Sequence, residues 1–67
     1  MDVREGKQYR FKDGTRARCQ VLRIDPGNIP VFRGAADLVI GILDGPNMGM
    51  EIPFGMMARF KECVVPA

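Results

Sequence analysis

Turn-forming residues divide this chain into segments that are too short for long helices. They cluster at five places along the 67 residues, which are Asp13-Gly14, Pro26-Gly27-Asn28, Gly34, Gly45-Pro46-Asn47 and Gly55. Segments of this length suit strands better than helices. The chain is therefore expected to be built mainly from short strands.

Two early segments show the alternation of a half-buried strand. Polar and aromatic residues alternate over residues 8–11, and basic and small apolar residues alternate over residues 16–21. After Val21 the phase slips, so that Leu22 and Ile24 fall on the face opposite Val21. We predict a β-bulge or sharp bend there, which would return both sets of apolar residues to one core.

The second half of the chain predicts a hairpin and a short helix. Residues 37–43 carry apolar side chains on both faces, which is typical of a central or covered strand. A tight loop joins this segment to a second strand over residues 50–54, where Pro53 lacks an N–H and favours an edge or a bulge. The remaining segments are one helical turn at residues 56–58 and a last strand over roughly residues 59–65.

These elements predict an all-β fold in a single domain, residues 1–67. Five or six short strands with a long, bent second strand resemble a small antiparallel barrel of the SH3-like type. The alternative is an α+β domain with one helix near residues 34–43, where Ala35 tolerates a helix but Val39 and Ile40 disfavour it. Because so short a chain has little core, we expect self-association to add stability.

Absent residue types exclude most catalytic chemistry. The sequence contains no His, Ser or Trp, so neither a Ser-His-Asp triad nor a His-based metal site can form within one chain. Cys19 and Cys63 stand too far apart for the CxxC pairs of a zinc site. We therefore expect no enzyme activity, no metal and no cofactor.

The sequence also predicts no membrane partner. Its longest apolar run, residues 38–43, is far shorter than the roughly 20 residues that span a bilayer. Residues 1–6 contain no apolar stretch that could serve as a signal peptide. We expect a cytoplasmic protein whose thiols are reduced.

Basic charge is concentrated in the first half of the chain. Residues 1–33 contain eight Lys or Arg and four Asp or Glu, whereas residues 34–67 contain two and four. Most of these basic side chains are Arg, whose planar guanidinium suits phosphates and carboxylates. The first hairpin is therefore the candidate anion-binding element.

Two registers are open for this hairpin. A two-residue turn at Asp13-Gly14 would place Tyr9 opposite Arg18 and mix rings with charges on one face. A three-residue loop would place Arg10 opposite Arg16 and separate a polar face from an apolar one. Like charges opposite each other are unfavourable by roughly a few tenths of a kcal/mol, so the second register invites an anion between them.

The leading functional hypothesis is a non-catalytic binding module for an anionic partner. Nucleic acid is the first choice of partner, and an acidic protein surface is the other. The predicted contact residues are Arg10, Arg16 and Arg18, with Tyr9 close by. The plain alternative is that these arginines are only solvated.

A second hypothesis is a homo-oligomeric protein–protein interaction module. It uses the apolar strand over residues 37–43 and the Met/Phe segment over residues 48–60, because flexible thioethers suit adaptable contacts. The predicted contact residues are Val39, Leu43, Met56 and Met57.

Overall fold

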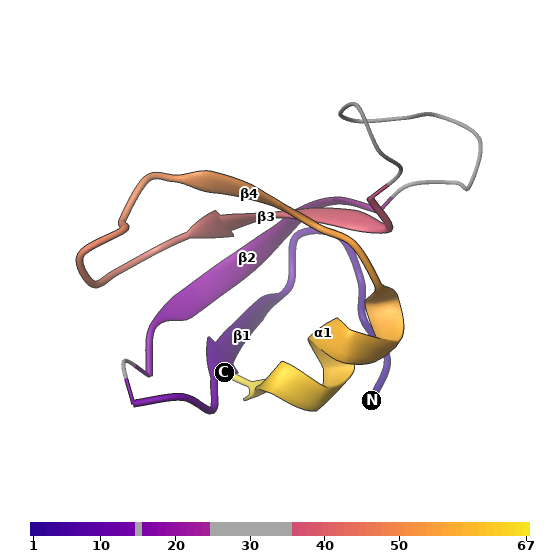
Figure 1. Cartoon of the computed structure of the whole chain (residues 1–67), viewed down its shortest axis with the longest axis horizontal. Helices are drawn as coiled ribbons and strands as arrows, with labels where there is room; N and C mark the ends of the chain where they lie inside the picture. Colours follow the sequence, from indigo (N-terminus) through magenta and orange to yellow (C-terminus); the bar gives the residue numbers. More distant parts are fainter. Residues whose placement is uncertain (15, 25–35) are drawn as a thin grey trace.

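The computed structural model describes residues 1–14, 16–24 and 36–67. These residues form one sheet and one short helix, in the chain order β1 (Gln8–Phe11), β2 (Arg18–Ile24), β3 (Leu38–Ile42), β4 (Glu51–Phe54), α1 (Met57–Cys63) and β5 (Val64–Pro66). The strands lie in the order β4-β3-β2-β1-β5, and each neighbouring pair is antiparallel (Figure 1). The prediction of a mainly antiparallel β fold is confirmed.

Within the part of the chain that the structure describes, the sheet is open. β4 and β5 are its two edges and do not pair with each other, so the predicted closed barrel is not shown. The alternative of a helix near residues 34–43 is wrong for the described part of that range, because it contains strand β3. Gly34 and Ala35 lie outside the described residues, as does the predicted turn at Pro26-Gly27-Asn28.

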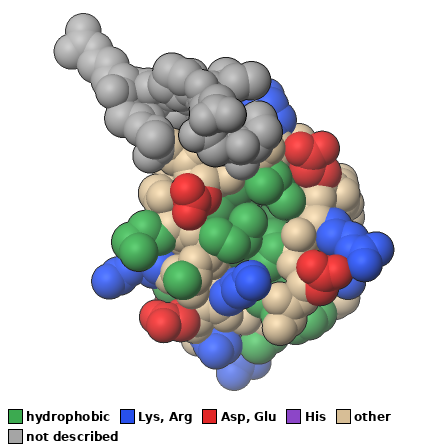
Figure 2. All heavy atoms as spheres, turned by 90° about the vertical axis from the view of Figure 1, so that its right-hand side faces the viewer, with side chains coloured by type: hydrophobic (Ala, Val, Ile, Leu, Met, Phe, Trp, Pro, Cys, Tyr) green, Lys and Arg blue, Asp and Glu red, His purple; other side chains and the backbone are tan. Residues whose placement is uncertain are grey.

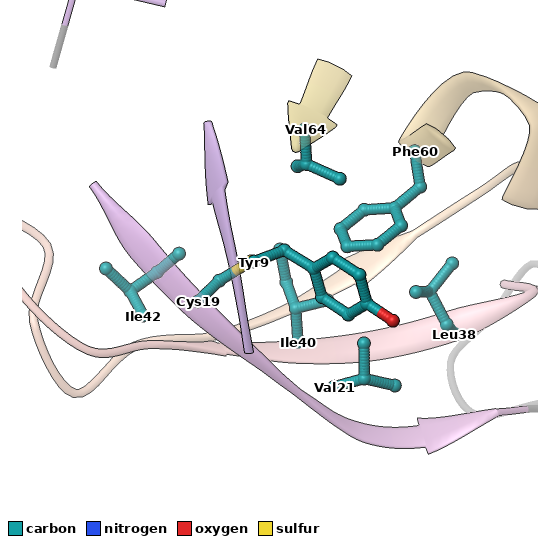
Figure 3. Packing of buried hydrophobic residues seen from close by; sticks show 8 residues of the cluster. All are labelled: Tyr9, Cys19, Val21, Leu38, Ile40, Ile42, Phe60 and Val64. Atoms are coloured by element: carbon teal, nitrogen blue, oxygen red, sulfur yellow. The ribbon is translucent and has the colours of Figure 1, made fainter. Parts of the chain in front are cut away.

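One face of the sheet carries the hydrophobic core. Residues directly opposite each other on neighbouring strands share a face, and the pairs Tyr9–Cys19 and Val21–Ile40 both point into the core. The buried cluster, drawn in Figure 3, consists of Tyr9, Cys19, Val21, Leu38, Ile40, Ile42, Phe60 and Val64. The opposite face of β1 and of the first half of β2 is therefore left to polar side chains.

The predicted bulge in β2 is confirmed. Val21 pairs with Ile40 and Ile24 pairs with Leu38, and the register shifts between them. The shift returns Ile24 to the core face, where it packs against the buried cluster. The prediction that the bulge also returns Leu22 to the core is wrong. Leu22 stays on the other face and packs over Gly41, where a Cβ would come within 3.2 Å of the Leu22 Cδ1 atom.

The helix is longer than the sequence predicts. The predicted single turn at residues 56–58 continues to Cys63, and the last strand is shortened to the three residues of β5. Helical geometry lets Phe60 reach inward, where its ring packs edge-on against Tyr9 at 5.5 Å and Phe54 at 5.4 Å between ring centroids. Burial of that ring explains why residues 59–63 are helical rather than extended.

Both edges of the sheet carry a proline that faces outward. Cys63 and Ala67 both form backbone hydrogen bonds with β1 or with the residue that follows it. In an antiparallel pair this arrangement turns the nitrogen of Pro66 away from the sheet. In the same way the Met50 carbonyl accepts a bond from β3, which turns the nitrogen of Pro53 outward. The predicted edge position of Pro53 is confirmed, and each edge lacks an N–H that an added strand would need.

Replacing Tyr9 with Phe should destabilise the fold modestly. The Tyr9 hydroxyl donates to the Asp2 carbonyl at 3.2 Å and accepts the Arg4 N–H at 3.3 Å, which ties down the N-terminal segment. Because the ring is kept, we expect a loss of about 1 kcal/mol, which is roughly 4–8 °C in Tm for a domain of this size. Thermal unfolding measures it, and Tyr9→Leu, which also loses the edge-on ring contact, should cost more. An unchanged Tm for Tyr9→Phe would show that these two bonds do not stabilise the fold.

Candidate functional site

The first hairpin has a longer loop than either predicted register allows. Gln8 pairs with Gln20 and Arg10 pairs with Arg18, and the Phe11 N–H donates to the Ala17 carbonyl at 2.9 Å. Six residues, 12–17, therefore lie between the two strands, and both predicted registers are wrong. The separation of a polar from an apolar face is nevertheless observed, because this register also keeps the arginines on the side opposite the core.

The loop conformation explains the altered pairing. The Arg16 N–H donates to the Asp13 carbonyl at 3.2 Å, and Arg16 has a φ of 49°, in the left-handed region that non-glycine residues rarely adopt. Arg16 consequently lies in the loop rather than opposite Arg10. The two residues still meet, because the Arg10 Nη1 atom donates to the Arg16 carbonyl at 2.7 Å.

Asp44 holds Arg18 in place from a distant loop. Its carboxylate accepts the Arg18 backbone N–H at 2.8 Å and the Arg18 Nε–H at 2.9 Å. These bonds from Arg18 hold the pKa of Asp44 below its usual range, and the charge of Arg10 adds to the effect. Asp44 stands directly before Gly45, a position that is typical of a turn residue. It lies 26 positions after Arg18, so the sequence gives no signal that the two side chains meet.

We call the solvent side of this hairpin the arginine face: Gln8, Arg10, Arg18 and Gln20 lie on it, and Arg16 borders it from the loop. Gln20 is oriented by a bond from its Nε2 atom to the Gly6 carbonyl at 3.0 Å. On the other side of β1, Val65 pairs with Arg10 and is 42% exposed. The face is thus a row of guanidinium and amide groups flanked by an exposed apolar side chain.

Tyr9 does not belong to this face. Its side chain is fully buried, and its ring packs against Phe60 in the core (Figure 3). The prediction that it lies beside the arginines as a contact residue is therefore corrected: the strand alternation that exposes Arg10 turns its neighbour inward.

The four predicted oligomer contacts lie in different environments. Val39 is fully buried within a single chain, so it offers no surface to a partner, and its predicted role is corrected. Leu43 is half-buried and donates its N–H to the Arg18 carbonyl at 2.9 Å. Met57 packs against the core cluster, whereas Met56 is 60% exposed. Of these four residues, only Met56 is well placed for an intermolecular contact.

A cavity of about 210 Å³ lies on the core side of the sheet, near the loop after β3. Its walls are mostly apolar, and they include Phe11, Ile42 and Ile52, together with the carboxylates of Asp13 and Asp44. Asp44 is already bound by Arg18, so its carboxylate is not free to act as a base in this cavity. No group of metal-binding side chains occurs among the residues that the structure describes.

The two thiols differ in burial. Cys19 is fully buried, and burial raises the pKa of its thiol to about 11. A thiol with so high a pKa is almost entirely protonated at neutral pH and is a poor nucleophile. Cys63 is half-buried at the end of α1.

Surface charge on one other side of the molecule is mixed in sign (Figure 2). Figure 2 shows the side of the molecule that lies at the right in Figure 1, where acidic and basic side chains surround a group of hydrophobic ones. That side therefore carries no patch of a single sign within the described residues. The arginine face remains the strongest candidate for binding an anion.

The chain was compared with protein-family models, with curated proteins and with solved structures, and none of the three comparisons gave a match. Among the described residues, no helix has the length and apolar character required to cross a membrane.

Replacing Asp44 with Asn should make stability less sensitive to acid. A carboxyl whose pKa is lower in the folded state stabilises the fold above its ordinary pKa of about 3.9, and this contribution is lost as the pH falls through the folded value. We therefore expect Asp44→Asn to be less stable than wild type at pH 7, with the difference in Tm shrinking below about pH 4. Thermal unfolding between pH 7 and pH 3 measures this. A constant difference over that range would show that the Asp44–Arg18 ion pair does not act on stability.

Proposed function

We propose that this chain is a non-catalytic binding module whose arginine face holds an anionic partner, with nucleic acid as the first choice. The supporting observation is the pairing of Arg10 directly opposite Arg18 on the solvent side of β1 and β2. Two like charges on one rung are unfavourable, and Asp44 offsets only one of them, so a further anion that contacts both arginines is favoured.

The charge balance around the face supports an anionic partner. Among the described residues, ion pairs engage Arg4, Arg18 and Arg23, whereas no carboxylate lies within 4.0 Å of Arg10 or Arg16. Arg10 and Arg16 therefore carry positive charge at the loop end of the hairpin that no described carboxylate pairs directly.

The bond to Asp44 leaves part of Arg18 free for a ligand. Asp44 occupies the Nε–H and the backbone N–H of Arg18, while a guanidinium has five N–H donors in total. The terminal NH₂ groups of Arg18 can still donate to a phosphate. Asp44 thus fixes the direction of Arg18 and also lowers the net charge of the face, which favours weak, salt-sensitive binding.

We also propose a fold type and a cellular compartment for this chain. The fold is an SH3-like barrel that stops short of closure, which is supported by the strand order and by the contacts of Phe60 with both β1 and β4. The compartment is the cytoplasm, which is supported by the free thiols of Cys19 and Cys63.

The double variant Arg10→Gln/Arg16→Gln should weaken binding to nucleic acid. Arg18 is kept, because its removal would leave Asp44 without its partner and would confound binding with stability. With three phosphate contacts, the wild type should show a log–log salt slope of roughly −2 to −3, and the variant should lose about 1.4 to 1.8 of it. Fluorescence anisotropy of labelled oligonucleotides between about 50 and 200 mM salt measures the slope.

The matched control is Arg59→Gln/Lys61→Gln, which removes the same charge from exposed positions of α1. This control should bind like wild type. An equal loss in both variants would show that only net charge matters, and a lack of binding to any oligonucleotide at about 50 mM salt would exclude nucleic acid as the partner.

Self-association through the Met/Phe segment is a second candidate function. Met48, Met50 and Met56 are 69%, 51% and 60% exposed, which is unusual for large apolar side chains in so small a protein. Pairing through the sheet edges is disfavoured by Pro53 and Pro66, so a contact between copies would use side chains rather than backbone.

Replacing Met48 and Met50 with Gln tests this candidate. If these side chains form the contact, light scattering should give a dimer or larger assembly for the wild type at micromolar concentration and a monomer for Met48→Gln/Met50→Gln. The control is Val65→Gln, which removes an exposed apolar side chain from β5. A monomeric wild type, with a Tm that does not depend on concentration, would rule the candidate out.

A further inference from the structure

We propose that the arginine face binds the sugar-phosphate backbone of double-stranded nucleic acid and reads no bases. This inference rests on the proposed function and specifies the form of nucleic acid and the mode of contact. Three features of the structure support it: the burial of the aromatic rings, the central position of the face in the sheet, and the chemistry of its donors.

The first feature concerns stacking. Proteins that bind single strands use exposed aromatic rings on which bases stack, worth about 1–3 kcal/mol per base. Of the rings that the structure describes, Tyr9 and Phe60 are fully buried, and Phe11 and Phe54 are half-buried against the core. The fifth ring, Phe32, lies outside the described residues. Within the described part of the chain, the arginine face therefore has no platform for unpaired bases.

The second feature concerns width. A free two-stranded ribbon fits the major groove of B-DNA, which is about 12 Å wide. Here β1 and β2 are flanked by β5 and β3, and four strands spaced about 4.8 Å apart already span roughly 14 Å between the outer two. At the level of the arginines, Val65 and Leu43 flank Arg10 and Arg18. The hairpin cannot enter the groove without its neighbours, so it meets the backbone first.

The third feature concerns the donors. Arg10 and Arg18 are neighbours across one rung, and Gln8 and Gln20 are neighbours across the next. Guanidinium and amide groups that stand on a broad sheet surface suit phosphate oxygens, which carry no sequence information. The Gln20 amide already donates to the Gly6 carbonyl, which leaves it less free to read the edge of a base. The expected mode is thus backbone contact without sequence preference.

The test compares two 20-base-pair duplexes of unrelated sequence with one of their single strands, by anisotropy of the labelled oligonucleotides at about 50 mM salt. We expect the two duplexes to bind within about threefold of each other, because a base-reading site loses roughly tenfold or more per wrong base pair. We expect the single strand to bind at least about fivefold more weakly, because the described part of the arginine face offers no ring on which bases could stack. Arg10→Gln/Arg16→Gln should weaken duplex binding, and Arg59→Gln/Lys61→Gln should not.

Each outcome separates this inference from the proposed function. Binding of the single strand as tightly as the duplexes would overturn the inference but leave the function standing. A preference of about tenfold or more for one duplex would overturn the claim that no bases are read. Duplex binding that survives Arg10→Gln/Arg16→Gln would show that the contacts lie elsewhere. A lack of binding to all three probes would overturn the proposed function itself.

Discussion

The packing of one ring, Phe60, determines the shape of this protein. It lies edge-on against Tyr9 of β1 and against Phe54 of β4, at centroid distances of 5.5 and 5.4 Å. In the sheet β1 and β4 are separated by β2 and β3, which in a flat sheet would place them about 14 Å apart. The sheet must therefore curl around Phe60, and α1 must reach far enough along the chain to present that ring (Figure 3).

The candidate site depends on this core. Arg10 follows Tyr9, and Arg18 precedes Cys19, so each arginine is fixed by a neighbour that is fully buried. Rigid strands position a charged group more precisely than a mobile loop does. Asp44 adds a second constraint, because it ties the loop after β3 to the start of β2 through two bonds to Arg18.

The surface offers partners two kinds of contact and disfavours a third. The arginine face suits an anion, and the exposed methionines between β3 and α1 suit an apolar contact. Strand addition at either edge is disfavoured, since Pro53 and Pro66 each leave an outward position without a donor. The two proposed modes use different residues, so one chain can bind an anion and associate with a second copy.

The sequence by itself determined the features that depend on local backbone rules and on alternation. These are the short strands, the bulge after Val21, the two-sided burial of residues 38–42 and the edge position of Pro53. Only the tertiary structure decided which distant groups meet. The partnership of Asp44 with Arg18 and the length of α1 each depend on contacts between segments far apart in the chain. Local spacing carries no information about such contacts, because their two partners lie far apart in the sequence.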